Sequence, residues 1–320
     1  MTSVSIIICT RNRAGSLKLT LESLGQLDIP NHHSAELIIV DNDSTDGTAQ
    51  LVQTLRLPNL PLRYINERRR GKSNCLNTAL AAAHGEIILW TDDDVRVPHD
   101  WIAGMCEVIQ KGEADVTAGE VALAPNLERP WMTSFHRSWL ADTRGLPKER
   151  IPFGINMAFH RHVLETVPFL DTDLGPGALG SGEEILFCLQ LKHAGFRIVP
   201  APPVVEHHFE PSRLLYGSWK KRAWIEGRIE AYYSYHWFHT DIRFARLRAL
   251  FKAVQLACFR IYHGEVADDQ EGCSADEAYL IKYLEFFRGY HEEQKKLRNY
   301  ELNGLVRRDF ASAKPTRTPP

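Results

Sequence analysis

The sequence lacks the features that mark several specialised classes of protein. Its six cysteines include no pair at C-x-x-C spacing in a chain of 320 residues, so reduced thiols are expected rather than a zinc ribbon or a disulfide framework. No run reaches the ~18 uninterrupted apolar residues of a transmembrane helix. The formal net charge of -2 gives no global basic field for nucleic acid, and no internal repeat is present. An ordinary globular protein remains.

The N-terminal apolar run covers residues 4–9 and is interrupted by Ser5. It is too short for the core of a signal peptide, and no basic region precedes it. We therefore expect a buried first strand and a cytoplasmic protein.

Short apolar runs alternate with helical patterns over the first hundred residues. Runs of about five apolar residues, each followed by a polar turn, are typical of parallel strands buried on both faces. The alternation predicts a doubly wound α/β sheet, which binds ligands at the carboxyl ends of its strands. The expected strands cover residues 4–9, 36–40, 62–66 and 86–90, and the expected helices cover residues 15–26, 48–55 and 72–83.

The pattern changes after residue 114, where glycine and proline become denser. A helix is expected over residues 183–194, with Gly195 as a left-handed cap. A short strand is expected over residues 196–199, ended by Pro202-Pro203. The predicted organisation is a first domain over residues 1–213, with halves 1–114 and 115–213, a helical extension over residues 214–310 and a disordered tail over residues 311–320.

The predicted helical extension contains a basic amphipathic segment over residues 243–261. It is interpreted either as a helix packed on the first domain or as a helix that docks on the cytoplasmic surface of a membrane. Ser274 and Glu277 have capping-box spacing at the start of a later helix. The apolar residues that share one face are Leu247, Leu250, Phe251, Val254 and Ile261, and the basic residues that interrupt the apolar run are Arg243, Arg246, Lys252 and Arg260.

Three carboxylates, Asp92, Asp93 and Asp94, follow the strand expected over residues 86–90. They repel one another, and a divalent cation relieves this repulsion. Mg²⁺ and Mn²⁺ favour oxygen ligands, often one or two carboxylates together with substrate phosphates. Alternate residues of an extended turn can reach one ion, so Asp92 and Asp94 are the expected pair. A solvated charged turn is the alternative interpretation.

Polar clusters also follow the first two expected strands, at residues 10–12 and 41–48. The local interpretation of the second cluster is a turn that caps the next helix. The functional interpretation adds Asp41 as a carboxylate that accepts hydrogen bonds from a nucleobase N–H or a ribose hydroxyl.

Four segments occur in order: SIIICTRNR at residues 5–13, VDNDSTDGT at 40–48, GKSNCLN at 71–77 and TDDD at 91–94. Their order and register together resemble family 2 of the glycosyltransferases, the inverting enzymes with the GT-A fold. The implied fold is a Rossmann-like, mostly parallel sheet flanked by helices. Later segments agree, so the resemblance covers roughly residues 4–228. These segments are residues 153–159, 174–177, 182–189, 205–207 and 222–227, together with Arg213.

The resemblance implies a nucleotide-diphosphate sugar as donor and a divalent metal on its phosphates. Asp94 is implied as the more direct metal ligand, together with Asp92, and His207 would complete the site. A mixed carboxylate and imidazole set favours Mn²⁺ over Mg²⁺. The residues implied to line the nucleotide-sugar pocket are Thr10, Arg11, Asn12, Asp41, Gly71, Lys72, Asn77, Asp92 and Asp93.

The family's usual Glu-Asp pair appears in this chain as Glu183-Glu184. Glu184 stands at the position of the catalytic Asp and is implied as the general base, with Glu183 as the alternative. An acceptor hydroxyl is a poor nucleophile and needs such a base within hydrogen-bond reach. The helix dipole favours the ionised form of a carboxylate at a helix start. The alternative interpretation is that the two glutamates only cap the first turn of the helix.

The predicted function is therefore inverting, metal-dependent transfer of a sugar, with a UDP-sugar as the favoured donor. The expected acceptor is a hydroxyl of a glycan or a lipid-linked molecule, in polysaccharide or glycoconjugate synthesis. The expected cofactor is Mn²⁺ or Mg²⁺, and no nucleic acid partner is expected. The basic segment is the reason to expect peripheral contact with the inner face of the cell membrane. Two alternatives are a metal-dependent nucleotidyltransferase and a catalytically silent nucleotide-binding scaffold subunit.

Overall fold

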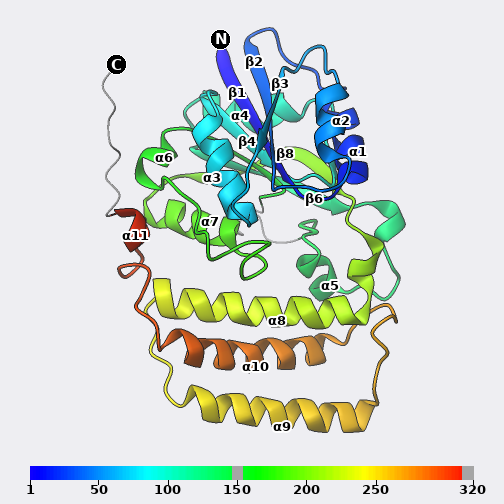
Figure 1. Ribbon diagram of the computed structural model, residues 1–320, viewed down its shortest axis with the longest axis vertical. Coiled ribbons are helices and arrows are strands. Elements are labelled where there is room, and N and C mark those ends of the chain that lie inside the picture. The colour runs from blue at the N-terminus through cyan, green and yellow to red at the C-terminus, as the bar shows by residue number, and fades with distance from the viewer. Residues whose placement is uncertain (146–153, 312–320) are drawn as a thin grey trace. The chain divides into compact units, whose positions relative to one another are not determined.

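The computed structural model describes residues 1–145 and 154–311 (Figure 1). The chain forms two compact units, each described separately below. The first unit comprises Met1–Thr166 and Thr172–Glu210, and the second comprises Val167–Asp171 and Pro211–Pro320. Phe153 of one predicted motif and residues 312–320 of the predicted tail lie outside the described residues. Ala311, the first residue of that tail, ends the short helix α11 (Arg308–Ala311).

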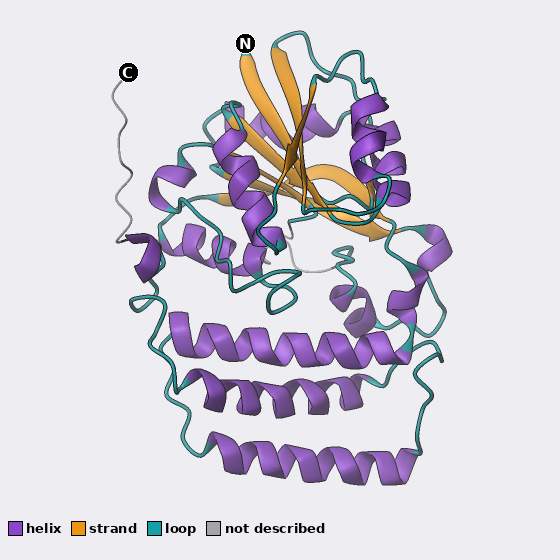
Figure 2. Cartoon of the chain, in the orientation of Figure 1, coloured by secondary structure: helices purple, strands orange, loops and turns teal. Residues whose placement is uncertain are grey.

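The first unit is built on one sheet, which has eight strands within the described residues (Figure 2). Their order across the sheet is β3-β2-β1-β4-β7-β6-β8-β5. The strands are β1 (Thr2–Thr10), β2 (His33–Asp41), β3 (Leu62–Asn66), β4 (Ile87–Thr91), β5 (Val95–Arg96), β6 (Val116–Leu123), β7 (Asn156–His160) and β8 (Ile198–His207).

The first four strands of the sheet order run parallel, in the registers expected of a doubly wound fold. Thr10 lies opposite Asp41 at the carboxyl ends of β1 and β2, and Ile8 lies opposite Thr91 of β4. β7 is antiparallel to both β4 and β6, whereas β6 and β8 are parallel. The apolar runs of β1, β2 and β4 are buried on both faces, as Ile6 and Ile7 show with no exposed surface, whereas β3 at the edge of the sheet is only partly buried.

Helices flank this sheet (Figure 2). α3 packs on β1 and β2, whereas α4 packs on β6, β7 and β8. The four predicted helices occur within two residues of their expected ends, and Gly195 adopts the predicted left-handed conformation with φ +88°. The helices are α1 (Ala14–Leu24), α2 (Thr48–Thr54), α3 (Lys72–Ala82), α4 (Trp101–Gln110), α5 (Ser134–Trp139), α6 (Val163–Thr166) and α7 (Glu183–His193), and η1 (Pro125–Leu127) is a 3-10 turn.

The predicted short strand over residues 196–199 is wrong in length, because β8 runs through Pro202-Pro203 to His207. A register shift after Gly119 of β6 accommodates the two prolines, which cannot donate ladder hydrogen bonds. The strand therefore carries His207 to the edge of the sheet where the first strands end.

The second unit is helical. Its long helices are α8 (Tyr216–Tyr232), α9 (Ala245–His263) and α10 (Ala275–Glu293). α10 lies between α8 and α9 and packs against both (Figure 1). Shorter turns are the 3-10 helix η2 (Pro211–Leu214) and the π-helix η3 (Tyr233–Trp237). The predicted fold class, a mostly parallel α/β sheet with a helical C-terminal region, is confirmed.

Two details of this unit differ from expectation. Ser274 is the N-cap of α10, but the predicted capping box is wrong, because its side chain makes no capping hydrogen bond. The Glu277 carboxylate instead accepts hydrogen bonds from Tyr216 (2.6 Å) and Arg260 (2.8 Å). The apolar face predicted for α9 forms, and its large side chains are exposed, as Leu247 shows with 64% exposure.

Candidate active site

Parallel pairing brings the polar residues after β1, β2 and β4 to one edge of the sheet. Thr10 ends β1 and is 4% exposed, and its hydroxyl donates a 2.6 Å hydrogen bond to Asp93. The loops after β1 and β2 are also joined to each other. Asn12 donates from its backbone N–H to the Ser44 hydroxyl (2.8 Å), and its side-chain oxygen accepts from the Thr45 N–H (2.7 Å).

One carboxylate caps two helices at this edge. Asp46 accepts hydrogen bonds from the backbone N–H of Ala14, at the start of α1, and of Thr48, at the start of α2, both at 3.0 Å. The N-cap position of α2 is held by Gly47, which has no side chain to cap with, and Asp46 just before it accepts from the first backbone N–H groups of both helices.

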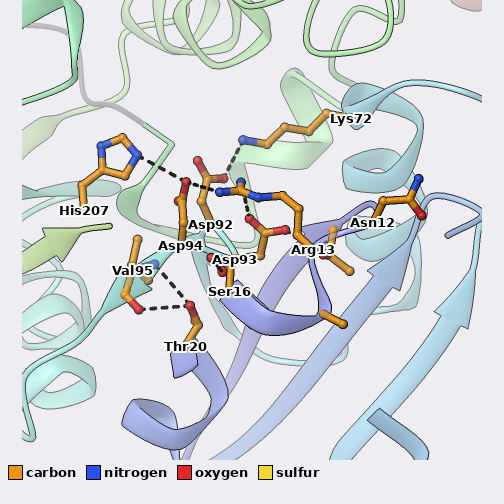
Figure 3. A network of polar contacts seen from close by, with 12 residues as sticks. Asn12, Arg13, Ser16, Thr20, Lys72, Asp92, Asp93, Asp94, Val95 and His207 are labelled. Atoms are coloured by element: carbon orange, nitrogen blue, oxygen red, sulfur yellow. Dashed lines mark hydrogen bonds and ion pairs between the residues drawn. The ribbon is translucent and has the colours of Figure 1, made fainter. Parts of the chain in front are cut away.

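The three carboxylates after β4 contact two cationic side chains, Lys72 and Arg13 (Figure 3). Asp92 accepts a 2.5 Å hydrogen bond from Lys72 Nζ. Arg13 contacts the other two, because one guanidinium nitrogen lies 2.7 Å from Asp93 and the other 2.9 Å from Asp94. Two cations thus offset the crowding of charge that the sequence predicted.

Burial and neighbouring charges shift the pKa values of Asp93 and Asp94 in opposite directions. Burial raises the pKa of Asp93 to about 7, with Asp94 adding to the rise and Arg13 opposing it. Burial also raises the pKa of Asp94, but His207 and Arg13 outweigh it and hold that pKa well below its usual range. Arg13 was not among the predicted site residues. Its place within the segment of residues 5–13, three residues past a strand end, was the available signal.

His207 is held in the orientation of a metal ligand. It is 2% exposed, and its Nδ1 lies 3.1 Å from the Leu140 carbonyl oxygen. Because a carbonyl oxygen can only accept a hydrogen bond, Nδ1 carries the hydrogen. When the ring is neutral, its Nε2 therefore carries the lone pair, and this atom lies 3.5 Å from Asp94 Oδ2. Asp94 Oδ1 is buried and has no hydrogen-bond partner among the described residues.

Two lone-pair atoms that face each other and an orphaned carboxylate oxygen fit a divalent cation. Across residues 1–145 and 154–311, no three His, Cys, Asp or Glu side chains converge as a metal site. Asp94 and His207 come together, whereas Asp92 is turned to Lys72. Two protein ligands suffice for Mg²⁺- or Mn²⁺-type sites that take further oxygens from water and substrate phosphates.

The Asp41 carboxylate lies at the end of β2 and is 1% exposed. It accepts hydrogen bonds from the Ser44 N–H (3.0 Å) and the Tyr64 hydroxyl (2.7 Å). Burial and Asp41 together raise the pKa of Tyr64 to about 12. Tyr64 was not predicted as a site residue, and nothing in its local sequence pointed to this contact. Arg11 of the predicted set is exposed to solvent.

The segment 71–77 begins with a backbone conformation that suits glycine. Gly71 has φ +119° and donates its N–H to the Asn42 side-chain oxygen (2.9 Å). Lys72 opens α3, and its Nζ lies 2.5 Å from Asp92 and 3.7 Å from Glu183. Lys72 therefore links the carboxylates after β4 to the start of α7. Asn77 lies in the second turn of α3 and is half-buried.

The two glutamates open α7 after Gly182, whose φ of +98° is left-handed. Glu183 is 2% exposed, whereas Glu184 is only partly buried. Burial and the neighbouring Glu184 raise the pKa of Glu183 to about 8, against the opposing charge of Lys72. Each glutamate has one buried Oε2 atom without a hydrogen-bond partner in the described part of the chain.

The fold and the polar edge of its sheet can be compared with known proteins. The model of glycosyl transferase family 2 matches residues 5–167, about half of the chain. The chain therefore belongs to glycosyl transferase family 2.

Two relatives extend this result. The succinoglycan biosynthesis protein ExoM of Rhizobium meliloti is 30% identical over 139 residues, which are 42% of this chain and 44% of ExoM. Glycosyltransferase AglE of Haloferax volcanii is 25% identical over 213 residues, or 64% of this chain and 66% of AglE. The chain thus spans less than two thirds of each relative.

Solved structures share the fold. The mannosyltransferase PcManGT of Pyrobaculum calidifontis, in complex with GDP-Man and Mn²⁺, gives a TM-score of 0.53 at 23% identity, covering 88% of this chain and 69% of that one. Residues 1–349 of TarS from Staphylococcus aureus, in complex with UDP-GlcNAc, give 0.51 at 16% identity, covering 93% of both chains. The fold is therefore that of the GT-A glycosyltransferases.

Proposed function

We propose that this protein is an inverting, metal-dependent glycosyltransferase that moves a sugar from a nucleotide-diphosphate donor to an acceptor hydroxyl. The proposal rests above all on the buried pair Asp94 and His207, whose facing lone-pair atoms lie 3.5 Å apart at the carboxyl edge of the sheet. Family membership supports transfer of a sugar, and Lys72 connects this edge to the two glutamates of α7.

Asp94 and His207 would hold Mn²⁺ or Mg²⁺, with the orphaned Asp94 Oδ1 free to turn toward the ion. The ion would supply positive charge to the diphosphate as it leaves the sugar. Asp92 stays paired with Lys72 in this proposal, or exchanges Lys72 for the ion when the donor binds. Thr10 and Asp41, which are buried, would form the nucleotide side together with Asn77 and the exposed Arg11 and Asn12.

Glu184 would accept the proton of the acceptor hydroxyl. Its neighbour Glu183 is buried against Lys72, and burial raises its pKa to about 8, which favours its protonated form near neutral pH and makes it the less suitable base. Glu184 is the more accessible of the two carboxylates. Glu183 would instead position Lys72 and offer a proton donor to a neighbouring oxygen.

The donor and acceptor are proposed from the relatives. The names of ExoM and AglE support synthesis of a polysaccharide or another glycoconjugate, with a glycan or a lipid-linked molecule as acceptor. The ligands of TarS and PcManGT make a UDP-sugar the first donor to test and GDP-mannose the second. A cytoplasmic location, where such donors would be used, completes the proposal.

The proposal is tested by mixing the full chain with a panel of UDP-, GDP-, dTDP- and CDP-sugars, with and without Mn²⁺, and analysing the products. We expect one nucleotide class to yield nucleoside diphosphate in the presence of the metal, and Asp94→Asn to abolish this release. Pyrophosphate release would indicate a nucleotidyltransferase instead. Binding of a nucleotide without any turnover, in the presence of glycan and lipid-linked acceptors, would favour the scaffold. The anomeric configuration of the product by NMR tests inversion.

A further inference from the structure

Helix α9 turns its large apolar side chains toward solvent. They recur at spacings of three and four residues and so share one face of the helix. Over its 19 residues the helix extends about 28 Å, a long strip to leave in water. The exposed residues and their exposed fractions are Phe244 76%, Leu247 64%, Leu250 61%, Phe251 60%, Val254 53%, Ile261 84% and Tyr262 85%.

This strip is not the surface by which α9 is held in its unit. The buried side chains of α9 are Ala245, Ala249 and Leu256, at 4%, 7% and 8% exposure. They lie on the opposite side of the helix and face the packing partner α10, because a step of 100° per residue places them about half a turn from Leu247 and Val254. Of the large apolar side chains of α9, Leu256 is buried, whereas most of the others lie on the exposed face, the reverse of ordinary packing.

The charge around the strip has one sign. Between residues 242 and 263 the chain carries five Lys and Arg residues and no carboxylate. Arg260 is paired with Glu277, and Arg243 lies 3.7 Å from Asp241. Arg248 and Lys252 lie instead over aromatic rings of α10, at 5.8 and 5.6 Å, so their charges are not offset by an acidic partner.

A groove of about 300 Å³ between α9 and α10 adds a polar component beside the strip. Arg246 and Arg288 line it, Arg246 donates a 2.7 Å hydrogen bond to His291, and Arg288 is paired with Glu285 at 2.8 Å. Glu292, which also lines it, is paired with Arg228. Basic groups next to exposed apolar side chains match a phospholipid, with an anionic headgroup above acyl chains. The apolar walls of the groove include Ala249, Leu250, Ala253 and Phe287.

We propose that the exposed face of α9 docks the protein on an anionic lipid bilayer, lying in the plane of the headgroups. Among the described residues no helix has the length and apolar character to cross a membrane, and the charges of α9 suit the interface rather than the hydrocarbon core. A second copy of this chain is the less fitting occupant, because a two-fold contact along α9 would bring together two copies of a segment that carries five cations and no carboxylate.

The proposal goes beyond sugar transfer, and its test requires neither donor nor acceptor. The full chain is sedimented with phosphatidylcholine vesicles, with and without phosphatidylglycerol, at low and high salt. We expect binding to the anionic vesicles and a loss of binding at high salt. Leu247→Glu with Phe251→Glu should abolish binding. Arg248→Gln with Lys252→Gln should weaken it roughly fivefold for each cation removed.

Matched variants separate this surface from general stickiness and from misfolding. Leu297→Glu with Leu302→Glu alters two exposed leucines outside α9 and should bind like the unaltered protein, as should Lys18→Gln with Lys111→Gln. Melting temperatures confirm that each variant is folded. The proposal is overturned if the unaltered protein fails to sediment with anionic vesicles, or if the α9 variant binds as well as it does. A dimer in sedimentation velocity that Leu247→Glu with Phe251→Glu dissociates would assign the face to a second copy instead.

Discussion

In most proteins charged side chains are exposed and large apolar side chains are buried. The edge of the sheet in the first unit departs from this rule by burying charge, and helix α9 in the second unit departs from it by exposing apolar side chains. The sheet edge buries carboxylates, with Asp94 and Glu183 each 2% exposed. Helix α9 leaves Leu247 and Ile261 in solvent at 64% and 84% exposure. Folding by itself favours neither arrangement, since buried charge and exposed apolar surface both cost free energy.

The two regions differ in what compensates this cost in free energy. At the sheet edge the compensation is internal, because Arg13, Lys72 and Thr10 contact the carboxylates directly. On α9 no segment of the described part of the chain covers the apolar strip, and the lipid surface proposed above would supply the compensation. Local departures from folding rules that are partly or wholly uncompensated are the places where function is expected.

The sharpest test of the sheet edge is Glu184→Gln, which removes the proposed base but keeps the size of the side chain. We expect the turnover number to fall by about 10²- to 10⁴-fold, because the acceptor hydroxyl loses its proton acceptor. Donor affinity, measured by calorimetry, should stay unchanged. Glu183→Gln is the matched variant, and a larger loss of turnover there would move the base to Glu183.

Asp94→Asn and His207→Ala should each lower metal-dependent nucleotide affinity by about 100-fold, because each removes one donor atom from the proposed ion. Calorimetry with Mn²⁺ and the preferred nucleoside diphosphate measures this effect. His208→Ala is the control, since His208 pairs with Glu206 at 3.0 Å rather than with Asp94. Affinity equal to that of the unaltered protein in either ligand variant would remove the metal assignment.

Arg13→Met should lower the free energy of unfolding by about 2 kcal/mol, because Asp93 and Asp94 lose charged hydrogen bonds while remaining buried. The estimate allows for the 31% exposure of the Arg13 side chain. Urea denaturation measures the loss, and the exposed Arg11→Met is the control. Mn²⁺ should restore part of the stability. A variant as stable as the original protein would show that the carboxylates do not depend on Arg13.

Glu183 should make stability depend on pH. Its pKa is about 8 in the folded protein, whereas an unfolded glutamate has a pKa of about 4.3. Between these values the native state keeps a proton that the unfolded chain releases, so the free energy of unfolding falls as pH rises. Glu183→Gln should remove this decline, of about 1 kcal/mol per pH unit. Urea denaturation between pH 5 and 8 compares the two slopes, and parallel slopes would contradict the buried, protonated state.

The smallest effect is expected on the exposed face of α9. Leu247→Ser should change the free energy of unfolding by less than about 0.5 kcal/mol, because the side chain is already in water. Leu256→Ser, on the buried side of the same helix, should cost about 2 kcal/mol. Denaturation of both variants measures the contrast. Equal losses would mean that the strip is covered in solution by protein.

The sequence was most informative where local rules act alone. Short apolar runs predicted β1 to β4 closely, and helix starts such as Lys72 and Glu183 were placed correctly. The strand over residues 196–199 was cut short because prolines usually end a strand, whereas the partner strand β6 absorbed them through a change of register. Such an adjustment depends on a neighbour 80 residues away and leaves no local signal.

Side-chain partners were harder to predict than positions. Asp92 and Asp94 were expected to reach one ion from the same turn, but Lys72 of α3 draws Asp92 away. Ser274 and Glu277 have capping-box spacing, yet Tyr216 and Arg260 compete for the glutamate. In both cases a tertiary partner outweighed a local pattern. The choice between Glu183 and Glu184 as the base stays a prediction, for which the difference in burial between the two side chains is the structural argument.

The two hydrogen bonds of Asp46 have a consequence for how a donor would be received. Because this carboxylate holds the first turns of α1 and α2 together, and Asn12 joins the preceding loops, these segments form a preassembled wall rather than two independent flaps. A ligand that meets such a wall loses little entropy in ordering it, so more of its contact energy is retained as affinity. A substitution in either loop would then alter the conformation of both loops. A change of donor preference would therefore require coordinated substitutions in the loops after β1 and β2.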